Sequence, residues 1–188
     1  MRLFTAIDLP EDILRRMDRL LSSLRPEALI KWSPLDNLHI TTKFIGEWPP
    51  DRLPALESAL AEISPREPFT LEIRGLGWFP HEHSPKVLWC GVHAGPELAQ
   101  LAHDTEQRLA RLDIPAEDRP YAPHLTLARL KMPVPLQPLR ARVAELQPTV
   151  VGSFEVNEFC LYRSDPGSHS SVYRKLRTFR LQNALAAS

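Results

Sequence analysis

Two copies of one short pattern place a threonine two residues after a histidine. The first copy spans His39–Thr42 (HITT), the second spans His124–Leu127 (HLTL), and each lies in an apolar, β-branched run. On a β-strand, residues i and i+2 share one face and lie roughly 6–7 Å apart, so each copy presents its imidazole and its hydroxyl together. Two such strands side by side would surround one small space with two His and two Thr side chains.

This set of side chains is suited to moving protons on and off a tetrahedral anion. An imidazole has an unperturbed pKa of about 6.5, so near neutral pH one ring can be a neutral base while the other is a protonated acid. Thr hydroxyls donate to anionic oxygens. One His in an apolar strand is most often a packed residue, but the repeated His-x-Thr pattern favours phosphodiester hydrolysis. Thr is a poor metal ligand and no carboxylate lies at ligand spacing, so we expect no metal or other cofactor.

Composition predicts an ordinary globular protein. The chain has 188 residues, of which 43% are hydrophobic and 24% charged, and we expect one domain spanning 1–188. The formal net charge is zero and the pI is about 7.1, which excludes a chain-wide basic field for long duplex nucleic acid. A small anion or a nucleic-acid end remains possible as a ligand.

Cysteine usage and hydropathy indicate the compartment. Cys90 and Cys160 lie in apolar strand-like runs, which predicts two buried thiols rather than a disulfide framework. The sequence shows no signal peptide after Met1 and no apolar run approaching 18 residues. We therefore expect a cytoplasmic protein without membrane contact, and, as a separate expectation, a monomer.

Periodicity predicts alternating strands and helices. Strands are expected over 2–8, 38–45, 69–79, 86–93, 122–130, 151–162 and 172–181, and helices over 11–24, from 49 to 63, 98–112 and 139–146. The order of motif strand, helix, strand, strand occurs twice, and the helix at 11–24 could complete the second unit. The predicted fold class is α+β, with two antiparallel-sheet lobes related by a pseudo-twofold axis, helices outside and a central cleft.

The sequence around both motifs resembles a known family. The segments 32–47 (WSPLDNLHITTKFIGE) and 121–129 (YAPHLTLAR) resemble the two-histidine (2H) phosphoesterase superfamily. Within it the chain is similar to the bacterial and archaeal RNA 2′,3′-cyclic phosphodiesterases, historically named 2′-5′ RNA ligases. The opening at 2–9 and the late segment 161–164 also resemble that family, so the similarity covers essentially the whole chain.

The resemblance implies a bilobal 2H phosphoesterase fold and a metal-independent reaction. The substrates would be RNA 3′ ends or nucleoside 2′,3′-cyclic phosphates, which are hydrolysed to a 2′-phosphate and a 3′-hydroxyl. By this similarity His39 is the general base that activates water, and His124 is the acid that protonates the departing 3′-oxygen. Thr41 and Thr126 bind the phosphate.

Two further residues carry expectations from the same resemblance. Phe44 corresponds to an aromatic residue that stacks on the nucleobase, yet regular alternation places it on the face opposite His39, so this role needs a strand end or a bulge. Arg129 occupies the corresponding position after the second motif, where it would either neutralise phosphate charge or be a solvated cation. Thr42 stands where relatives more often have Leu, and we expect it to affect packing. Lys43 shares the motif face by regular alternation and could reach the ligand, but we expect a solvated side chain.

Several alternatives remain open. The segment His81–His83 (HEH) could bind a metal, although no third ligand lies nearby in the sequence. Basic residues in 174–180 are either a solvated strand or, beside a cleft, a local patch for RNA. The same catalytic residues would also suit a 2′-5′ RNA ligase or 2′-5′ phosphodiesterase. A module that binds RNA ends without catalysis would show binding without turnover.

Overall fold

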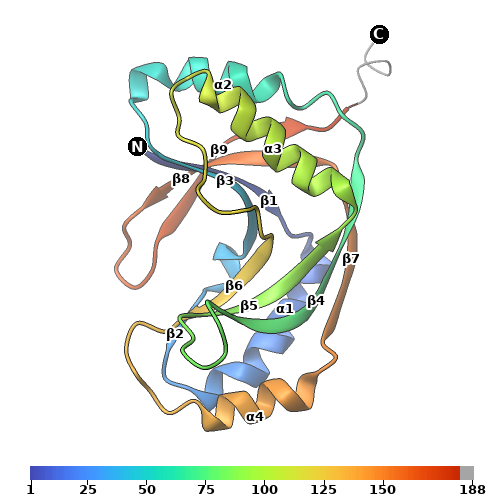
Figure 1. The fold of residues 1–188 in the computed structure, drawn as a ribbon, viewed down its shortest axis with the longest axis vertical. Coiled ribbons are helices and arrows are strands. Elements are labelled where there is room, and N and C mark those ends of the chain that lie inside the picture. Colours follow the sequence, from blue (N-terminus) through green and yellow to red (C-terminus); the bar gives the residue numbers. More distant parts are fainter. Residues whose placement is uncertain (183–188) are drawn as a thin grey trace.

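The fold is built from two antiparallel sheets. A computed structural model describes residues 1–182, and Figure 1 shows the two sheets one above the other. Sheet A has the order β3-β1-β8-β9 and sheet B the order β2-β6-β5-β4-β7. The strands are β1 (Arg2–Asp8), β2 (Lys31–Trp32), β3 (His39–Glu47), β4 (Phe69–Phe79), β5 (Val87–Ala94), β6 (His124–Arg129), β7 (Val150–Val156), β8 (Glu158–Asp165) and β9 (Val172–Arg180).

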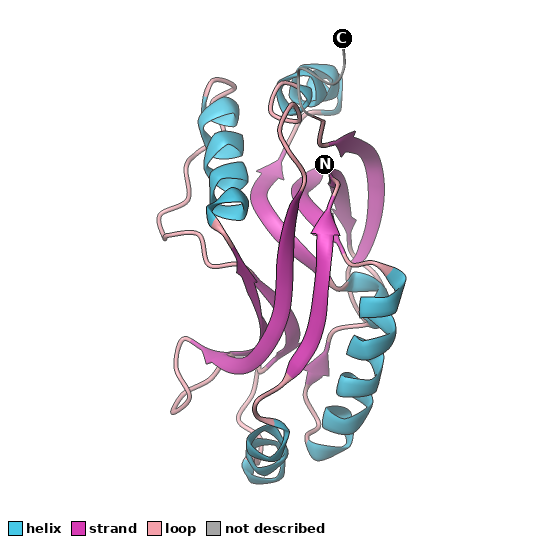
Figure 2. Ribbon diagram, turned by 90° about the vertical axis from the view of Figure 1, so that its right-hand side faces the viewer, coloured by secondary structure: helices cyan, strands magenta, loops and turns pink. Residues whose placement is uncertain are grey.

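The helices lie on the outer faces of the sheets. They are α1 (Glu11–Leu24), α2 (Leu53–Ala61), α3 (Pro96–Ala110) and α4 (Gln137–Leu146), with single 3₁₀ turns at Arg25–Glu27, Leu35–Asn37 and Pro50–Arg52. Helices α2 and α3 pack with sheet A, whereas α1 and α4 lie beside sheet B, and Figure 2 shows the strands in the middle with helices around them. The predicted α+β class, with antiparallel sheets and helices outside, is therefore confirmed.

Helix α1 shows how the sequence determines one of these contacts. It buries Ile13, Met17, Leu21 and Leu24, which recur at helical spacing, and it begins with two acidic residues that favour a helix N-terminus. The Arg16 guanidinium donates to the carbonyl oxygen of Val151 in β7 at 2.8 Å. Helix α1 thus packs against β7, one of the strands that the prediction assigned to the second unit.

The predicted single strand over 151–162 is wrong. The chain leaves sheet B at Val156 and enters sheet A at Glu158, so β7 pairs with β4 while β8 pairs with β1. Asn157 lies between them, and its carbonyl oxygen accepts a hydrogen bond from the Leu181 amide at 2.8 Å. No Gly or Pro marks this change of sheet, and apolar residues continue on both sides, so the pattern reads as one long strand.

The repeated unit also differs from the prediction. Strand β3 lies in sheet A, whereas β4 and β5, assigned to the same unit, lie in sheet B. The order that repeats is strand, helix, motif strand, helix: β1-α1-β3-α2 and then β5-α3-β6-α4. In each copy the two strands pair with each other, while the helix between them packs on the opposite sheet. The helix that connects two paired strands of one sheet therefore covers the other sheet in both copies. Strand β2 has two residues and was too short to predict.

Two other expectations concern burial and membrane contact. Cys90 and Cys160 are free and buried, as predicted, and burial raises the pKa of their thiols to about 12 and about 11. Across residues 1–182, every helix is too short or too polar to cross a bilayer.

Candidate active site

Strands β3 and β6 touch each other, and both contain a bulge at the same place in the motif. Opposite β3, Thr5 pairs with Lys43 and Ala6 pairs with Thr41, so Thr42 is the extra residue. Opposite β6, Leu127 is the extra residue in the same way. Both strands show the same burial sequence, with a half-buried His and Thr, buried residues between and after them, and an exposed sixth residue.

The bulges return the sixth residue of each motif to the face of its His and Thr. An extra residue shifts the alternation by one position, so Phe44 and Arg129 rejoin that face. Phe4 pairs with Phe44 in register, and the ring centroid of Phe4 lies 6.4 Å from that of Phe44 and 4.8 Å from that of His39. Phe44 is 61% exposed. The bulge that a nucleobase-stacking role required is therefore present, while the role itself stays a prediction.

The imidazole of His39 lies among aromatic rings. Phe4 stacks on it, and Tyr173 presents its edge at a centroid distance of 5.1 Å. This burial lowers the pKa of His39 to about 4, although a hydrogen bond to the backbone of Asn37 and the charge of Asp8 act in the opposite direction. At neutral pH the ring is uncharged.

A polar cluster behind His39 was missed by sequence reasoning. Asp8 lies opposite His39 in the β1–β3 register. Its carboxylate accepts hydrogen bonds from the Tyr162 hydroxyl and from Lys175 Nζ, the latter at 2.7 Å. Burial raises the pKa of Tyr162, and its hydrogen bond to Asp8 acts in the same direction, so the phenol stays protonated. These three residues come from distant strands, and the sequence carries no signal of their pairing.

The second histidine has a simpler environment. His124 Nδ1 lies 2.7 Å from the carbonyl oxygen of Ala122, two residues earlier. Because a carbonyl can only accept, Nδ1 carries the hydrogen, which leaves Nε2 as the reactive nitrogen. Phe79 meets this ring edge-on at 5.0 Å. Half-buried Thr126 follows on the same strand face, as Thr41 does after His39.

The buried residues of β3 have structural roles, and one expectation about them is wrong. Thr42 lies in the core with its Oγ1 2.7 Å from Thr5 Oγ1, which confirms the expected packing role. Lys43 is buried instead of solvated, because the bulge turns it away from the face of His39. Its Nζ lies 3.1 Å from Glu106 Oε1 in α3 and 2.8 Å from the carbonyl oxygen of Pro115.

The C-terminal basic residues are largely neutralised. Lys175 pairs with Asp8, Arg177 with Glu57 at 3.4 Å, and Arg174 with Asp165 at 3.5 Å.

By contrast, Arg129 and Lys31 lie opposite each other in the β2–β6 pair, both are exposed, and neither forms an ion pair within residues 1–182. Positive charge beside the His124 strand is therefore free to meet an anion.

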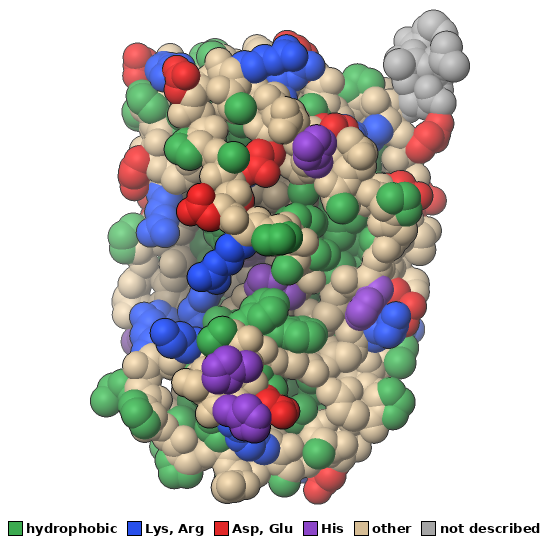
Figure 3. Space-filling view, in the orientation of Figure 1, with side chains coloured by type: hydrophobic (Ala, Val, Ile, Leu, Met, Phe, Trp, Pro, Cys, Tyr) green, Lys and Arg blue, Asp and Glu red, His purple; other side chains and the backbone are tan. Residues whose placement is uncertain are grey.

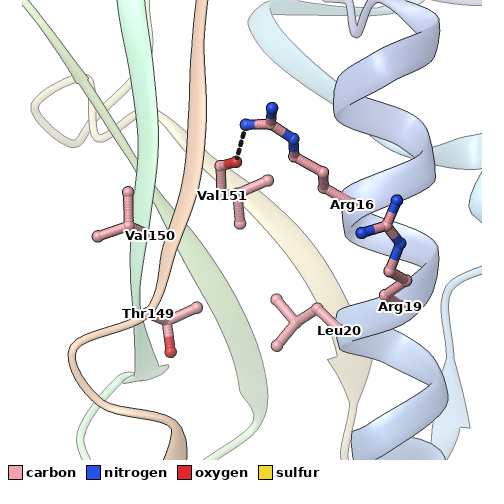
Figure 4. A pocket seen from close by; sticks show the side chains of 6 residues that line it. All are labelled: Arg16, Arg19, Leu20, Thr149, Val150 and Val151. Carbon is pink, nitrogen blue, oxygen red and sulfur yellow. Dashed lines mark hydrogen bonds between the residues drawn. The ribbon is translucent and has the colours of Figure 1, made fainter.

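Other surface features are a pair of neighbouring histidines, a hollowed face and a cavity between α1 and β7. The rings of His81 and His83 are 6.2 Å apart, and the described part of the chain contains no group of three His, Cys, Asp or Glu side chains arranged for a metal. The face in Figure 3 is hollowed near its middle, with His and basic side chains around the hollow. A cavity of about 340 Å³ opens between α1 and β7, and Figure 4 shows the Arg16 side chain reaching Val151 there. This cavity contains no motif residue.

Comparison with known proteins identifies relatives along nearly the whole chain. A family model of the 2′-5′ RNA ligase superfamily matches residues 9–168. The RNA 2′,3′-cyclic phosphodiesterase of Methanothermobacter thermautotrophicus is 32% identical over 182 residues, covering 96% of this chain and 98% of that protein. The protein of the same name from Thermus thermophilus is 34% identical over 192 residues, covering 97% of this chain and 91% of its own length.

Solved structures agree with this assignment. The crystal structure of TT0787 of Thermus thermophilus superposes with a TM-score of 0.84 at 32% identity, covering 98% of this chain and 100% of that one. E. coli LigT complexed with 3′-AMP superposes with a TM-score of 0.77 at 30% identity, covering 96% and 97% of the two chains. The family model, the sequence relatives and the shared fold agree, and the chain belongs to the 2′-5′ RNA ligase superfamily.

Proposed function

We propose that this protein hydrolyses the terminal 2′,3′-cyclic phosphate of RNA to a 2′-phosphate and a 3′-hydroxyl, without a metal. The names of its relatives support this phosphodiesterase activity. The observation that carries the proposal is the match between β3 and β6: two contacting strands present His, Thr and a sixth exposed residue through equivalent bulges.

The two histidines have the different properties that an acid–base pair needs. His39 is held uncharged by burial, so it can accept a proton from water at neutral pH. The hydroxide equivalent attacks phosphorus, a new P–O bond forms, and the bond from phosphorus to the 3′-oxygen breaks. In its protonated form His124 gives the Nε2 proton to that oxygen, while Nδ1–H stays bonded to Ala122. Solvent exchange then restores both rings.

The remaining residues act on charge and orientation. Thr41 and Thr126 donate hydrogen bonds to the non-bridging oxygens, where negative charge gathers in the transition state. Arg129 lies on the same face as Thr126 and adds a positive charge that no described residue neutralises. Phe44 stacks on the nucleobase of the terminal nucleotide.

The proposal extends to the working form of the protein. We propose that the chain acts as one bilobal domain and as a monomer, and that it works on RNA in the cytoplasm.

Hydrolysis of defined substrates tests the proposal. The protein is incubated with nucleoside 2′,3′-cyclic phosphates and with a short RNA that ends in a cyclic phosphate, with and without excess EDTA. Chromatography against 2′- and 3′-monophosphate standards identifies the product. We expect the 2′-phosphate at a rate that EDTA does not change. Formation of the 3′-phosphate, or a requirement for added divalent cations, would contradict the mechanism.

The family assignment supports a second candidate, cleavage or joining of 2′-5′ linkages by the same residues. A longer nucleotide would then replace water as the nucleophile, or would depart as the leaving group. Comparing kcat/KM for a cyclic phosphate with that for a 2′-5′ dinucleotide separates the two. Binding of both without turnover would indicate a binding module for RNA ends.

A further inference from the structure

The carbonyl group of each motif threonine accepts a hydrogen bond from a hydroxyl in the segment that leads into the other motif. The Tyr121 hydroxyl donates to the Thr41 carbonyl oxygen at 2.9 Å, and Tyr121 precedes His124 by three residues. The Ser33 hydroxyl donates to the Thr126 carbonyl oxygen at 2.8 Å, and Ser33 precedes His39 by six residues. We call these two contacts the crossing hydrogen bonds.

Both crossing hydrogen bonds occur where a sheet leaves motif carbonyls without a strand partner. Strand β3 is the edge of sheet A, so the Thr41 carbonyl has no neighbouring strand on that side. Strand β2 ends at Trp32, before it reaches Thr126. Ser33 continues along β6 in its place, and its amide also donates to the Leu127 carbonyl oxygen at 2.8 Å. The two hydroxyls therefore satisfy edge groups, and each ties the segment that leads into one motif strand to the other motif strand.

The segment before β6 is attached to β3 at a second point. Lys43 lies on β3 two residues after Thr41, the residue that Tyr121 contacts. Its Nζ donates to the Pro115 carbonyl oxygen and to Glu106. The chain from 115 to 121 is thus held along β3 at both ends. Burial raises the pKa of Tyr121, so its hydroxyl remains a donor at neutral and alkaline pH.

We infer that Tyr121 and Ser33 are positioning residues that set the separation of the two motif strands, and through it the distance between His39 and His124. The inference rests on the proposed two-histidine reaction, in which both rings act on one phosphorus centre. A displacement of about 1 Å can reduce a rate about 100-fold when reacting groups must be aligned. Neither residue touches substrate in this account, because each hydroxyl is bonded to a backbone carbonyl.

Two conservative variants test this role. Tyr121→Phe and Ser33→Ala each remove one oxygen from a half-buried side chain. We expect kcat for a nucleoside 2′,3′-cyclic phosphate to fall about 10- to 100-fold in each variant. We expect KM to change less than about threefold, because the phosphate-binding groups remain on their strands. Ser33→Thr retains the hydroxyl and should keep kcat near the wild-type value.

Matched controls separate positioning from stability. Ser64→Ala and Thr105→Val also remove a hydroxyl that donates to a backbone carbonyl, at 2.9 Å to Ala61 and 2.7 Å to Leu101, outside the motif strands. Thermal melting followed by circular dichroism shows that each variant is folded at the assay temperature, and assays move to a lower temperature for any that is not. The controls should lower the melting temperature while kcat stays within about twofold of wild type.

Two results would overturn the inference. One is an unchanged kcat in both Tyr121→Phe and Ser33→Ala. The other is a rise in KM alone, which would mean that the hydroxyls serve substrate binding. An inactive wild-type protein would instead contradict the proposed function, so the two failures are distinguishable.

Discussion

The ring of Phe4 stacks on the imidazole of His39, with centroids 4.8 Å apart and planes inclined by 26°. Together with the contact to Tyr173, this stacking shields much of the His39 ring from water, and this burial lowers its pKa to about 4. His124 has a single aromatic neighbour within residues 1–182, Phe79. The two histidines of a nearly symmetric pair are therefore placed in different environments, as different roles require.

The first prediction concerns the pH dependence of activity. The base must be uncharged, so kcat/KM should fall only as the pH drops through about 4, well below the usual 6.5 of histidine. Phe4→Leu admits water to the ring, so the acid limb should move toward pH 6.5. Phe79→Leu, beside His124, is the control and should leave that limb in place. An acid limb at 6.5 in the wild-type protein would show that His39 is not the buried base.

A second prediction concerns stability and needs no substrate. His39 has a lower pKa when folded than when unfolded, so the unfolded chain binds more protons between pH 6.5 and 4. Its contribution to the free energy of unfolding is complete above pH 6.5 and is lost as the pH falls toward 4, by on the order of 3 kcal/mol. Urea titrations of wild type and His39→Gln at pH 7 and pH 4 measure the difference. An equal loss of unfolding free energy between pH 7 and pH 4 in both proteins would contradict the lowered pKa of His39.

The motif hydroxyls should contribute to kcat. Thr41→Val and Thr126→Val each remove one donor to the phosphate at nearly constant volume, and we expect losses of roughly 10- to 1000-fold. Thr42→Val is the matched control on the same strand, because its hydroxyl faces Thr5 in the core. That control should lose stability, by about 1–2 kcal/mol, while retaining its activity. Full activity in either motif variant would mean that its hydroxyl does not reach the phosphate.

Phe44 should act on substrate binding. Loss of one base–aromatic contact costs about 1–3 kcal/mol, so Phe44→Ala should raise KM roughly 5- to 150-fold with little change in kcat. Val150→Ala replaces another exposed apolar side chain, on β7, and should leave KM unaltered. Steady-state kinetics with a nucleoside 2′,3′-cyclic phosphate measure both. An unaffected KM in Phe44→Ala would remove this residue from the site.

Local patterns in the sequence predicted most elements and the motif faces. Strand β1 and helix α1 have the predicted bounds, because alternation and helical spacing are visible within one segment. The burial of Lys43 and the Asp8–Tyr162 contact depend instead on bulges and on the pairing of distant strands. The change of sheet at Asn157 likewise follows from tertiary pairing. Such features require the register between segments, which a single sequence does not contain.

The assignment of roles to the two histidines is the central claim, and leaving-group chemistry tests it. A cyclic substrate with sulfur in place of the bridging 3′-oxygen releases a thiolate, which needs no proton from an acid.

Without that need, His124→Ala should recover most of its activity on the sulfur substrate, whereas His39→Ala should not, because water must still be deprotonated. The decisive measurement is single-turnover hydrolysis of the oxygen and sulfur substrates by both variants. Selective recovery of His124→Ala is the predicted result, and selective recovery of His39→Ala would contradict the account by reversing the roles.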